Sequence, residues 1–538
     1  MTAATPAAEH DRAPIELPHR ERIEILIAVL LGIFLAALDQ TIVGTALPVI
    51  VTDLQGNELY TWAFTAYLLT ATVSGPIYGK LSDIFGRRLL FLVGVAVFLL
   101  GSILCGLSQN MAMFIAFRGL QGLGAGALFP IALAIIGDIF SPSERGKYQG
   151  FFGAVFGVST LVGPAIGGLI TDNFGWHWIF YVNVPIGAVV LYLIWRILPT
   201  RREEDADRHI DYLGASLLVA ALVPMLIGFT NKQFGEWTDP DVGGLIAVGV
   251  ALAAVFVFVE SRAREPIVPL GLFRIRAFTA SVIAFFFAII GFFAAVVFLP
   301  RWFQFVQQTS ATESGYQILP LLLGLIVSAV ASGQIVARVR RYKTLTLVSL
   351  LVSAFGLYLL TNIRPDTPIW QLWLWMAVTG VGVGPTFAVF TLVVQNSVPV
   401  RALGSATSNL TLFQQIGGTI GLAVTGSLLG SVLVEEMPRQ MQEAGVPSQI
   451  ASQFGSGGGF DFNQLTSVGG DLGTVILSQV PEQFRAQVEP FIDAMVNGIY
   501  TAFSIGTAAT FWVGIATSLI AAVAVAVLMP AGRIGHRD

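Results

Sequence analysis

The chain has 538 residues, of which 55% are hydrophobic and 12% are charged, and its mean hydropathy is +0.75. A soluble globular domain carries about 25% charged residues, so this composition excludes a soluble enzyme and a disordered chain. The 29 Lys and Arg residues do not exceed the 33 Asp and Glu residues, which excludes a module that binds nucleic acid through its phosphates. The composition therefore indicates a polytopic membrane protein.

Fourteen apolar windows, most of about 20 residues or more, predict fourteen transmembrane helices. The windows are continuously apolar and do not alternate, so they do not favour membrane strands. They are residues 25–50, 59–78, 89–108, 111–136, 148–171, 177–198, 212–231, 242–260, 278–300, 314–337, 344–362, 371–397, 404–432 and 497–528.

Basic residues predict the orientation, because Lys and Arg collect in cytoplasmic loops. With the N-terminus inside, the inner segments hold 23 of the 29 Lys and Arg residues and the outer loops hold 5. We therefore expect a multi-pass protein of the plasma or inner cell membrane, with both termini in the cytoplasm.

Two charged stretches, 200–211 and 261–276, divide the spans into groups of six, two and six. This plan predicts an all-α membrane protein with two six-helix bundles and two inserted helices. The expected units are an N-terminal bundle with a short cytoplasmic tail (1–198), a linker with two extra transmembrane helices (199–276) and a C-terminal bundle (277–538). Within the last unit, residues 433–495 are expected to form a long, partly helical extracellular loop.

Asp39 lies inside the first predicted span. A charged side chain at this depth costs about 2.5–3.5 kcal/mol on insertion scales, and such residues usually face a bundle interior or a water-filled pathway. The functional interpretation is a proton or cation site. The structural alternative is a carboxylate satisfied by hydroxyls such as Thr41 or by another helix.

Arg118 is the only Lys or Arg that we place within a span, so it needs partners. Gln121 and Gly122 share its helix face, three and four residues further along. The functional interpretation is a counter-charge near the protonation site. The alternative is a structural contact with backbone carbonyls.

Residues 79–88 read GKLSDIFGRR and lie on the cytoplasmic side between the second and third spans. Gly79 and Gly86 permit a tight turn. Asp83 can cap a helix or pair with Arg87, Arg88 or an arginine of another helix. The segment is either an ordinary basic loop or a latch that forms in one conformation and breaks in another.

The fifth predicted span is rich in glycine. Gly157 belongs to a smooth strip, and Gly163, Pro164, Gly167 and Gly168 follow it. Pro164 removes a backbone donor, so we expect a kink. Close helix packing is one interpretation, and a helix that lines the interface between two moving bundles is its functional extension.

The chain has one cysteine, Cys105, which cannot form an internal disulfide and is expected to be a small core residue. The five histidines lie outside the middle of the spans. We therefore expect no catalytic residue, no metal site and no cofactor. With Asp39 as the candidate proton site, protons are the expected coupling ion.

Together these segments resemble the major facilitator superfamily, and specifically its fourteen-helix drug:proton antiporter branch. The segments that carry the resemblance are 38–48, 79–88, 118–122, 163–168 and 176–187. The resemblance covers nearly the whole chain. It implies proton-coupled export, with Asp39 and Arg118 at the coupling site and the fifth helix as the antiporter helix.

The substrate site is expected among aromatic and polar side chains of the spans, because aromatic faces bind cations and flat apolar compounds. No acidic residue lies in mid-span in the second half, which favours neutral or monocationic lipophilic substrates. The cavity candidates are Thr41, Tyr67, Gln121, Asn409, Phe413 and Gln414.

We therefore predict a secondary-active antiporter, not an enzyme, that exports small amphipathic compounds by alternating access. It is expected to act as a monomer in the lipid bilayer and to bind no nucleic acid. The alternatives are a transporter of lipids or cell-envelope precursors, and a non-transporting membrane receptor or scaffold.

Overall fold

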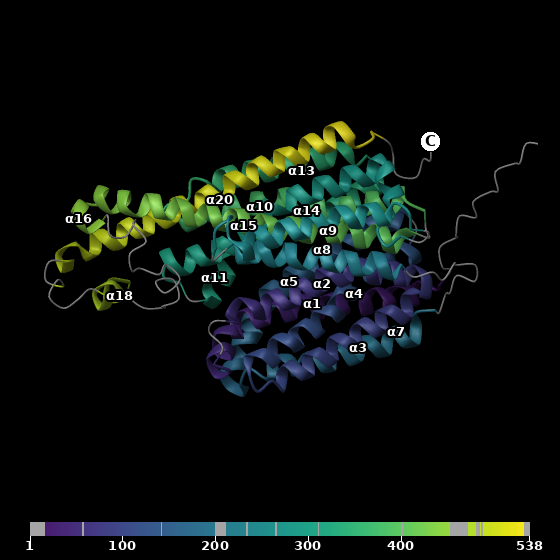
Figure 1. The fold of residues 1–538 in the computed structure, drawn as a ribbon. Coiled ribbons are helices and arrows are strands. Elements are labelled where there is room, and N and C mark those ends of the chain that lie inside the picture. Colours follow the sequence, from purple (N-terminus) through teal and green to yellow (C-terminus); the bar gives the residue numbers. More distant parts are fainter. Residues whose placement is uncertain are drawn as a thin grey trace, which may run out of the picture.

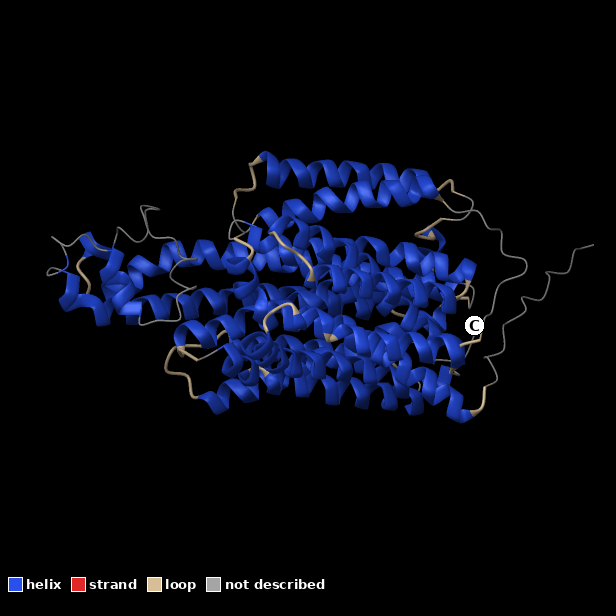
Figure 2. Ribbon diagram, turned by 90° about the horizontal axis from the view of Figure 1, so that it is seen from below, coloured by secondary structure: helices blue, strands red, loops and turns tan. Residues whose placement is uncertain are grey.

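A computed structural model of the chain describes residues 17–531 except 56–58, 141, 200–210, 233–234, 264–265, 310, 340, 400–401, 452–471, 480–484 and 486–487. The described residues are almost entirely helical (Figure 2). Their order is α1 (His19–Asp53), α2 (Tyr60–Phe85), α3 (Arg87–Gly106), α4 (Met111–Ile139), α5 (Pro142–Phe174), α6 (Trp178–Tyr181), α7 (Asn183–Ile197), α8 (Tyr212–Asn231), η2 (Pro240–Gly244), α9 (Leu245–Glu260), η3 (Leu270–Arg274), α10 (Arg276–Val306), α11 (Ala311–Gln317), α12 (Leu319–Val339), α13 (Lys343–Leu360), α14 (Ile369–Ser397), α15 (Leu403–Glu443), α16 (Ser448–Ala451), α18 (Leu472–Gln479), η6 (Glu489–Phe491) and α20 (Ile492–Leu528).

The predicted class of an all-α polytopic membrane protein is confirmed. Within the described residues, 12 helical segments are long and apolar enough to cross a membrane. Helices α2 and α5 occupy the other two predicted spans, with 26 and 33 residues. Helix α2 packs against α4, and α5 packs against α1.

Three predicted spans differ in detail from the observed helices. The sixth breaks between α6 and α7, and the tenth breaks between α11 and α12. Pro185 and Pro320 explain these breaks, because neither has an N–H for the carbonyl four residues earlier. The thirteenth span is longer than predicted, since α15 continues to Glu443, where Met437 and Met441 are buried.

The helices form two groups that meet along a long interface (Figure 1). Helices α1 to α7 pack on one another, and α10 and α12 to α15 pack together with α20. Between the groups, α5 packs against α12 and α15 packs against α2. The paired helices α8 and α9 join this interface, since α8 contacts both α2 and α15.

The C-terminal end of α15 and the N-terminal end of α20 project beyond the other helices, with α16 and α18 beside them (Figure 1). Buried apolar side chains join these elements, among them Met441, Leu472, Ile476 and Met495. The described part of 433–495 is thus a packed helical projection.

Gly163 sets the close approach of α5 to α1. A Cβ atom at this position would lie 2.0 Å from Thr41 Oγ1 and 2.6 Å from Thr41 Cβ. The Thr41 hydroxyl donates to the Ser159 carbonyl across the same contact, at 3.0 Å. Nothing lies within 4 Å of a Cβ built on Gly168, five residues further along.

Gly163→Ala should therefore lower the free energy of unfolding by about 1–3 kcal/mol, because the added methyl group overpacks the α1–α5 contact. Gly168→Ala is the matched control and should leave stability unchanged or slightly higher. Thermal unfolding of the purified protein in detergent measures both. Equal midpoints for the two variants would contradict the close contact.

Candidate functional site

The site begins with an ion pair inside the N-terminal group of helices. Asp39 of α1 is 1% exposed and Arg118 of α4 is 0% exposed, and Arg118 Nη1 lies 2.6 Å from Asp39 Oδ2. Each residue alone would be an uncompensated buried charge. Together they meet the requirement that buried charges are paired and hydrogen-bonded.

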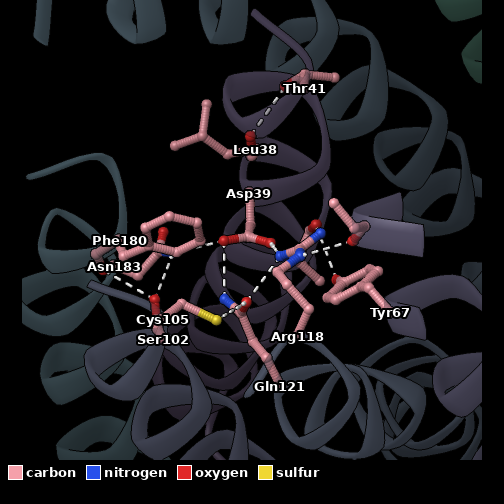
Figure 3. A network of polar contacts seen from close by, with 12 residues as sticks. Leu38, Asp39, Thr41, Tyr67, Ser102, Cys105, Arg118, Gln121, Phe180 and Asn183 are labelled. Carbon is pink, nitrogen blue, oxygen red and sulfur yellow. Dashed lines mark hydrogen bonds and ion pairs between the residues drawn. The ribbon is translucent and has the colours of Figure 1, made fainter. Parts of the chain in front are cut away.

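Amide side chains complete the surroundings of Asp39 (Figure 3). Gln121 Nε2 donates to Asp39 Oδ1 at 2.8 Å, and Asn183 Nδ2 of α7 donates to the same oxygen at 2.9 Å. Arg118 Nη1 also donates to Gln121 Oε1 at 2.7 Å. Asn183 donates in turn to the Ser102 hydroxyl of α3. The carboxylate therefore joins α1 to α4 and α7 through charge-assisted hydrogen bonds, and Asn183 extends the network to α3.

Two polar atoms in this network have no hydrogen-bond partner. Arg118 Nη2 and Asn183 Oδ1 are both buried and unsatisfied. An unsatisfied buried group costs about 1–3 kcal/mol, and more when it is charged. The network therefore holds unused capacity for a donor or acceptor, such as a water molecule or a proton carrier.

Tyr67 of α2 connects the ion pair to a cavity. The Arg118 guanidinium carbon lies 4.2 Å from the centre of the Tyr67 ring, a cation–π contact. Tyr67 also lines a cavity of about 200 Å³ that lies between the two groups of helices. Asp39 and Arg118 do not line this cavity, so Tyr67 separates the charges from it.

The cavity is apolar and aromatic, with a few polar side chains. Phe285, Phe292, Phe293 and Phe387 of the second group face the lining residues of α1, α2 and α4. The polar lining includes Gln40, Thr72, Gln414 and Gln415, and the Thr72 hydroxyl donates to Gln415 Oε1. None of the described lining residues carries a charge at neutral pH. Such a surface suits a lipophilic ligand with one or two polar groups.

The six cavity candidates separate into three groups. Tyr67 and Gln414 line the cavity, and Gln121 belongs to the ion-pair network. The Thr41 hydroxyl donates to backbone carbonyls, including that of Ser159, rather than to Asp39. Asn409 donates to the Ser405 carbonyl, and Phe413 packs against Phe273. These last three are outside the cavity lining.

Residues 79–88 hold the two groups of helices together at one end. Asp83 accepts hydrogen bonds from the Gly404 and Ser405 backbone N–H groups, at 3.1 and 2.8 Å, and from the Ser405 hydroxyl at 2.7 Å. These donors belong to the first turn of α15, where free N–H groups and the helix dipole favour a carboxylate. Arg87 pairs with Asp83 at 2.5 Å and with Asp138 of α4 at 3.1 Å.

The other predicted latch residues have separate positions. Gly86 has a φ of 95°, which favours glycine, and it forms the turn between α2 and α3. A Cβ at Gly79 would lie 2.2 Å from Ser408 Oγ, so α2 and α15 approach closely there. Arg88 instead donates to the Trp195 carbonyl of α7. It therefore has a contact within the N-terminal group.

The predicted antiporter-motif residues all lie on α5, which continues through Pro164 as one helix. Gly163 contacts α1, Gly167 is buried and Gly168 is partly exposed. The surroundings of Gly157 and Pro164 are outside the described side chains. Because α5 packs on both α1 and α12, it touches both groups of helices.

Sequence reasoning missed two members of the ion-pair network, Asn183 and Ser102. Both are fully buried. The signal for Asn183 was a buried amide in an otherwise apolar span, next to the aromatic segment 176–181. Ser102 gave no signal, because serine is common in transmembrane helices.

The buried charges, uncharged cavity and two packed groups of helices define a membrane transporter. Residues 29–422 match the Major Facilitator Superfamily, and the chain belongs to this family. The predicted membership of this superfamily is thereby confirmed.

Similar proteins are transporters and not enzymes. The chain is 35% identical to "Multidrug transporter protein MdtP" of Bacillus subtilis (strain 168), over 90% of each chain. It is 34% identical to "Tetracenomycin C resistance and export protein" of Streptomyces glaucescens, over 78% of each chain. Its fold is similar to that of the proton:xylose symporter XylE, with a TM-score of 0.59 and 13% identity over 96% of this chain and 98% of that chain.

Breaking the ion pair on one side should be more damaging than removing both charges. Asp39→Asn or Arg118→Gln alone leaves one buried charge unpaired, which we expect to lower the free energy of unfolding by about 3–5 kcal/mol. The double variant Asp39→Asn/Arg118→Gln should be more stable than either single variant. Unfolding of the detergent-solubilised protein measures this, with the exposed acid variant Asp53→Asn as control. Additive losses would contradict the coupling.

The contact between residues 79–88 and α15 should respond in graded steps. Ser405→Ala removes one of three hydrogen bonds to Asp83, whereas Asp83→Ala removes all three and leaves Arg87 with Asp138 and the Ser82 hydroxyl. We expect the distribution of distances between spin labels on the ends of α2 and α15 to broaden slightly in the first variant and strongly in the second. A label pair on α3 and α4 is the control, and equal distributions in all variants would contradict the latch.

Proposed function

We propose that this protein exports lipophilic or monocationic amphipathic compounds in exchange for protons, by alternating access. The observation that carries the proposal is the buried Asp39–Arg118 pair, which contacts an uncharged aromatic cavity through Tyr67. A charge site and a substrate site then lie on opposite sides of one side chain.

Protonation of Asp39 would change the forces within this network. Arginine stays charged at any physiological pH, so a neutral Asp39 leaves the guanidinium paired only with Gln121 and the Ala63 carbonyl. The weaker attraction to Asp39 would then allow the Arg118 guanidinium to shift relative to the Tyr67 ring. This movement is the proposed route by which a proton changes the shape of the cavity.

The membrane supplies the energy for the cycle in this proposal. One charge that crosses a potential of 100 mV provides about 2.3 kcal/mol. A proton that enters from the outside and neutralises Asp39 would favour outward release of the substrate. The Asp83 contact with α15 would close the cytoplasmic end during that step and break in the other half of the cycle.

The cavity lining supports the proposed substrates. Its phenylalanine rings can contact a flat apolar compound or a single cation, and its amides and hydroxyls can accept or donate a few hydrogen bonds. The part of the lining that the structure describes contains no carboxylate to select a divalent cation. The names of the relatives, a multidrug transporter and a resistance and export protein, favour export of the same kind of compound.

We also propose the setting in which the protein works. The excess of Lys and Arg on one side of the predicted spans supports a location in the cell membrane with both termini in the cytoplasm. The ion pair and the cavity both lie within one chain, which supports a transport unit that is a monomer and needs no bound cofactor. Its other partners are the lipid bilayer and the substrate.

The test is transport in proteoliposomes of a cationic dye and a neutral drug, with and without a pH gradient. The wild-type protein should accumulate both compounds against their gradients only when the pH gradient is present. Asp39→Asn should abolish this accumulation, because the site can no longer take up and release a proton.

Asp53→Asn is the matched control, since Asp53 is an exposed acid at the end of the same helix. It should transport at the wild-type rate. Transport that is indifferent to the pH gradient would overturn proton coupling, and accumulation by Asp39→Asn at the wild-type rate would exclude Asp39 as the coupling site.

A further inference from the structure

A second pair of carboxyl groups lies at the base of the α8–α9 hairpin, away from Asp39. Asp211 caps the start of α8, where its Oδ1 accepts from the Gly214 backbone N–H at 2.7 Å. Glu260 is the last residue of α9 and is 2% exposed. Its Oε1 accepts from the Val268 backbone N–H at 2.6 Å. One oxygen of each carboxyl group is therefore held by a backbone donor.

The other oxygen of each group has no donor. Asp211 Oδ2 and Glu260 Oε2 are buried and have no hydrogen-bond partner among the described residues. Both point into the same space, because a Cβ atom on Gly214 would lie 2.4 Å from the first and 2.5 Å from the second. The two carboxyl groups are within hydrogen-bonding reach of each other. Glycine at position 214 leaves the room that this arrangement needs.

Two ionised carboxylates at such a distance repel each other strongly, and a single proton between them removes the repulsion. The proton also gives the two unsatisfied oxygens their missing hydrogen bond, with one oxygen as donor and the other as acceptor. We infer that Asp211 and Glu260 bind one proton between them and form a second proton site of this protein. This inference does not depend on the proposed transport function.

The surroundings offer no competing positive charge among the described residues. Asp211 faces Glu260 across Gly214, and its charge acts on Glu260. Arg262, in the turn after α9, stacks on the Phe258 ring at 3.7 Å and donates to the Phe258 carbonyl. The facing segment contributes the backbone of Val268, and the contacts of α8 with α2 and α15 include the apolar Val73 and Leu412.

The shared proton would fasten the hairpin to the rest of the protein. Ile267 and Val268 are buried in the same apolar cluster as Leu218 and Leu222 of α8. The Val268 N–H bond to Glu260 joins this segment to the hairpin base. Loss of the proton leaves a second negative charge buried in this joint, so the hairpin should loosen as the pH rises.

Infrared spectroscopy of the full-length protein in liposomes tests the site directly. The measurement uses the Asp39→Asn/Arg118→Gln background, so that a proton on Asp39 cannot contribute and no unpaired charge remains at that site. We expect a carbonyl band of a buried protonated carboxyl group, which disappears as the pH is raised. Glu260→Gln in this background should lose the band, while Asp53→Asn should keep it. A band that survives Glu260→Gln, or no band at any pH, would overturn the inference.

Thermal unfolding against pH gives a second readout. The proton stabilises the native pair, so the wild-type midpoint should fall as the pH rises through the titration of the pair. Glu260→Gln should flatten this dependence, because its amide donates permanently to Asp211. If Glu260→Gln does not fold, Asp211→Asn serves instead, since its amide also donates across the pair. Stabilisation by Na⁺ that is lost in the variant, without an infrared band, would mean a cation site and overturn the proton site.

Discussion

The cost of placing a charge inside a membrane constrains the N-terminal half of this protein. Asp39 and Arg118 are acceptable there only because each neutralises the other and both find further hydrogen bonds. Satisfying them requires α1, α4 and α7 to present side chains to one point, while α3 supports Asn183 through Ser102. Glycine-mediated close contacts, such as Gly163 against Thr41, then bring the neighbouring helices near enough for this geometry.

The two halves differ in the kind of polar interaction that they bury. In the described residues, the N-terminal half places a full ion pair in its interior. The interior of the second half relies on neutral hydrogen bonds, such as that from the Trp302 indole to the Ser504 hydroxyl at 2.8 Å. Most of the aromatic lining of the cavity comes from that half, and Tyr67 and Phe129 of the N-terminal half complete it. Tyr67 is the point where the two chemistries meet, so a change of charge on one side can alter the apolar surface on the other.

The sequence made some of this predictable and left the rest hidden, for physical reasons. Asp39 and Arg118 were visible because a lone charge in an apolar span is costly and therefore rare. Asn183 was not selected, because an amide in a span has many satisfactory partners and only the fold shows which one it uses. Helix positions followed from apolar windows, but helix ends did not. Helical hydrogen bonding continues past the predicted end of the thirteenth span in α15, and in the sixth span it is interrupted near Pro185.

The inserted hairpin can be understood through the helices that it touches. Helix α8 packs on α2 and α15, the same two helices that Asp83 joins at their ends. Any relative movement of the two halves that separates α2 from α15 must therefore also strain the seat of α8. One carboxylate of this protein is neutralised by an arginine and, in our inference, two others share a proton. In that inference the hairpin would be held less tightly at high pH, which would give α8 and α9 a physical means to influence the contact between α2 and α15.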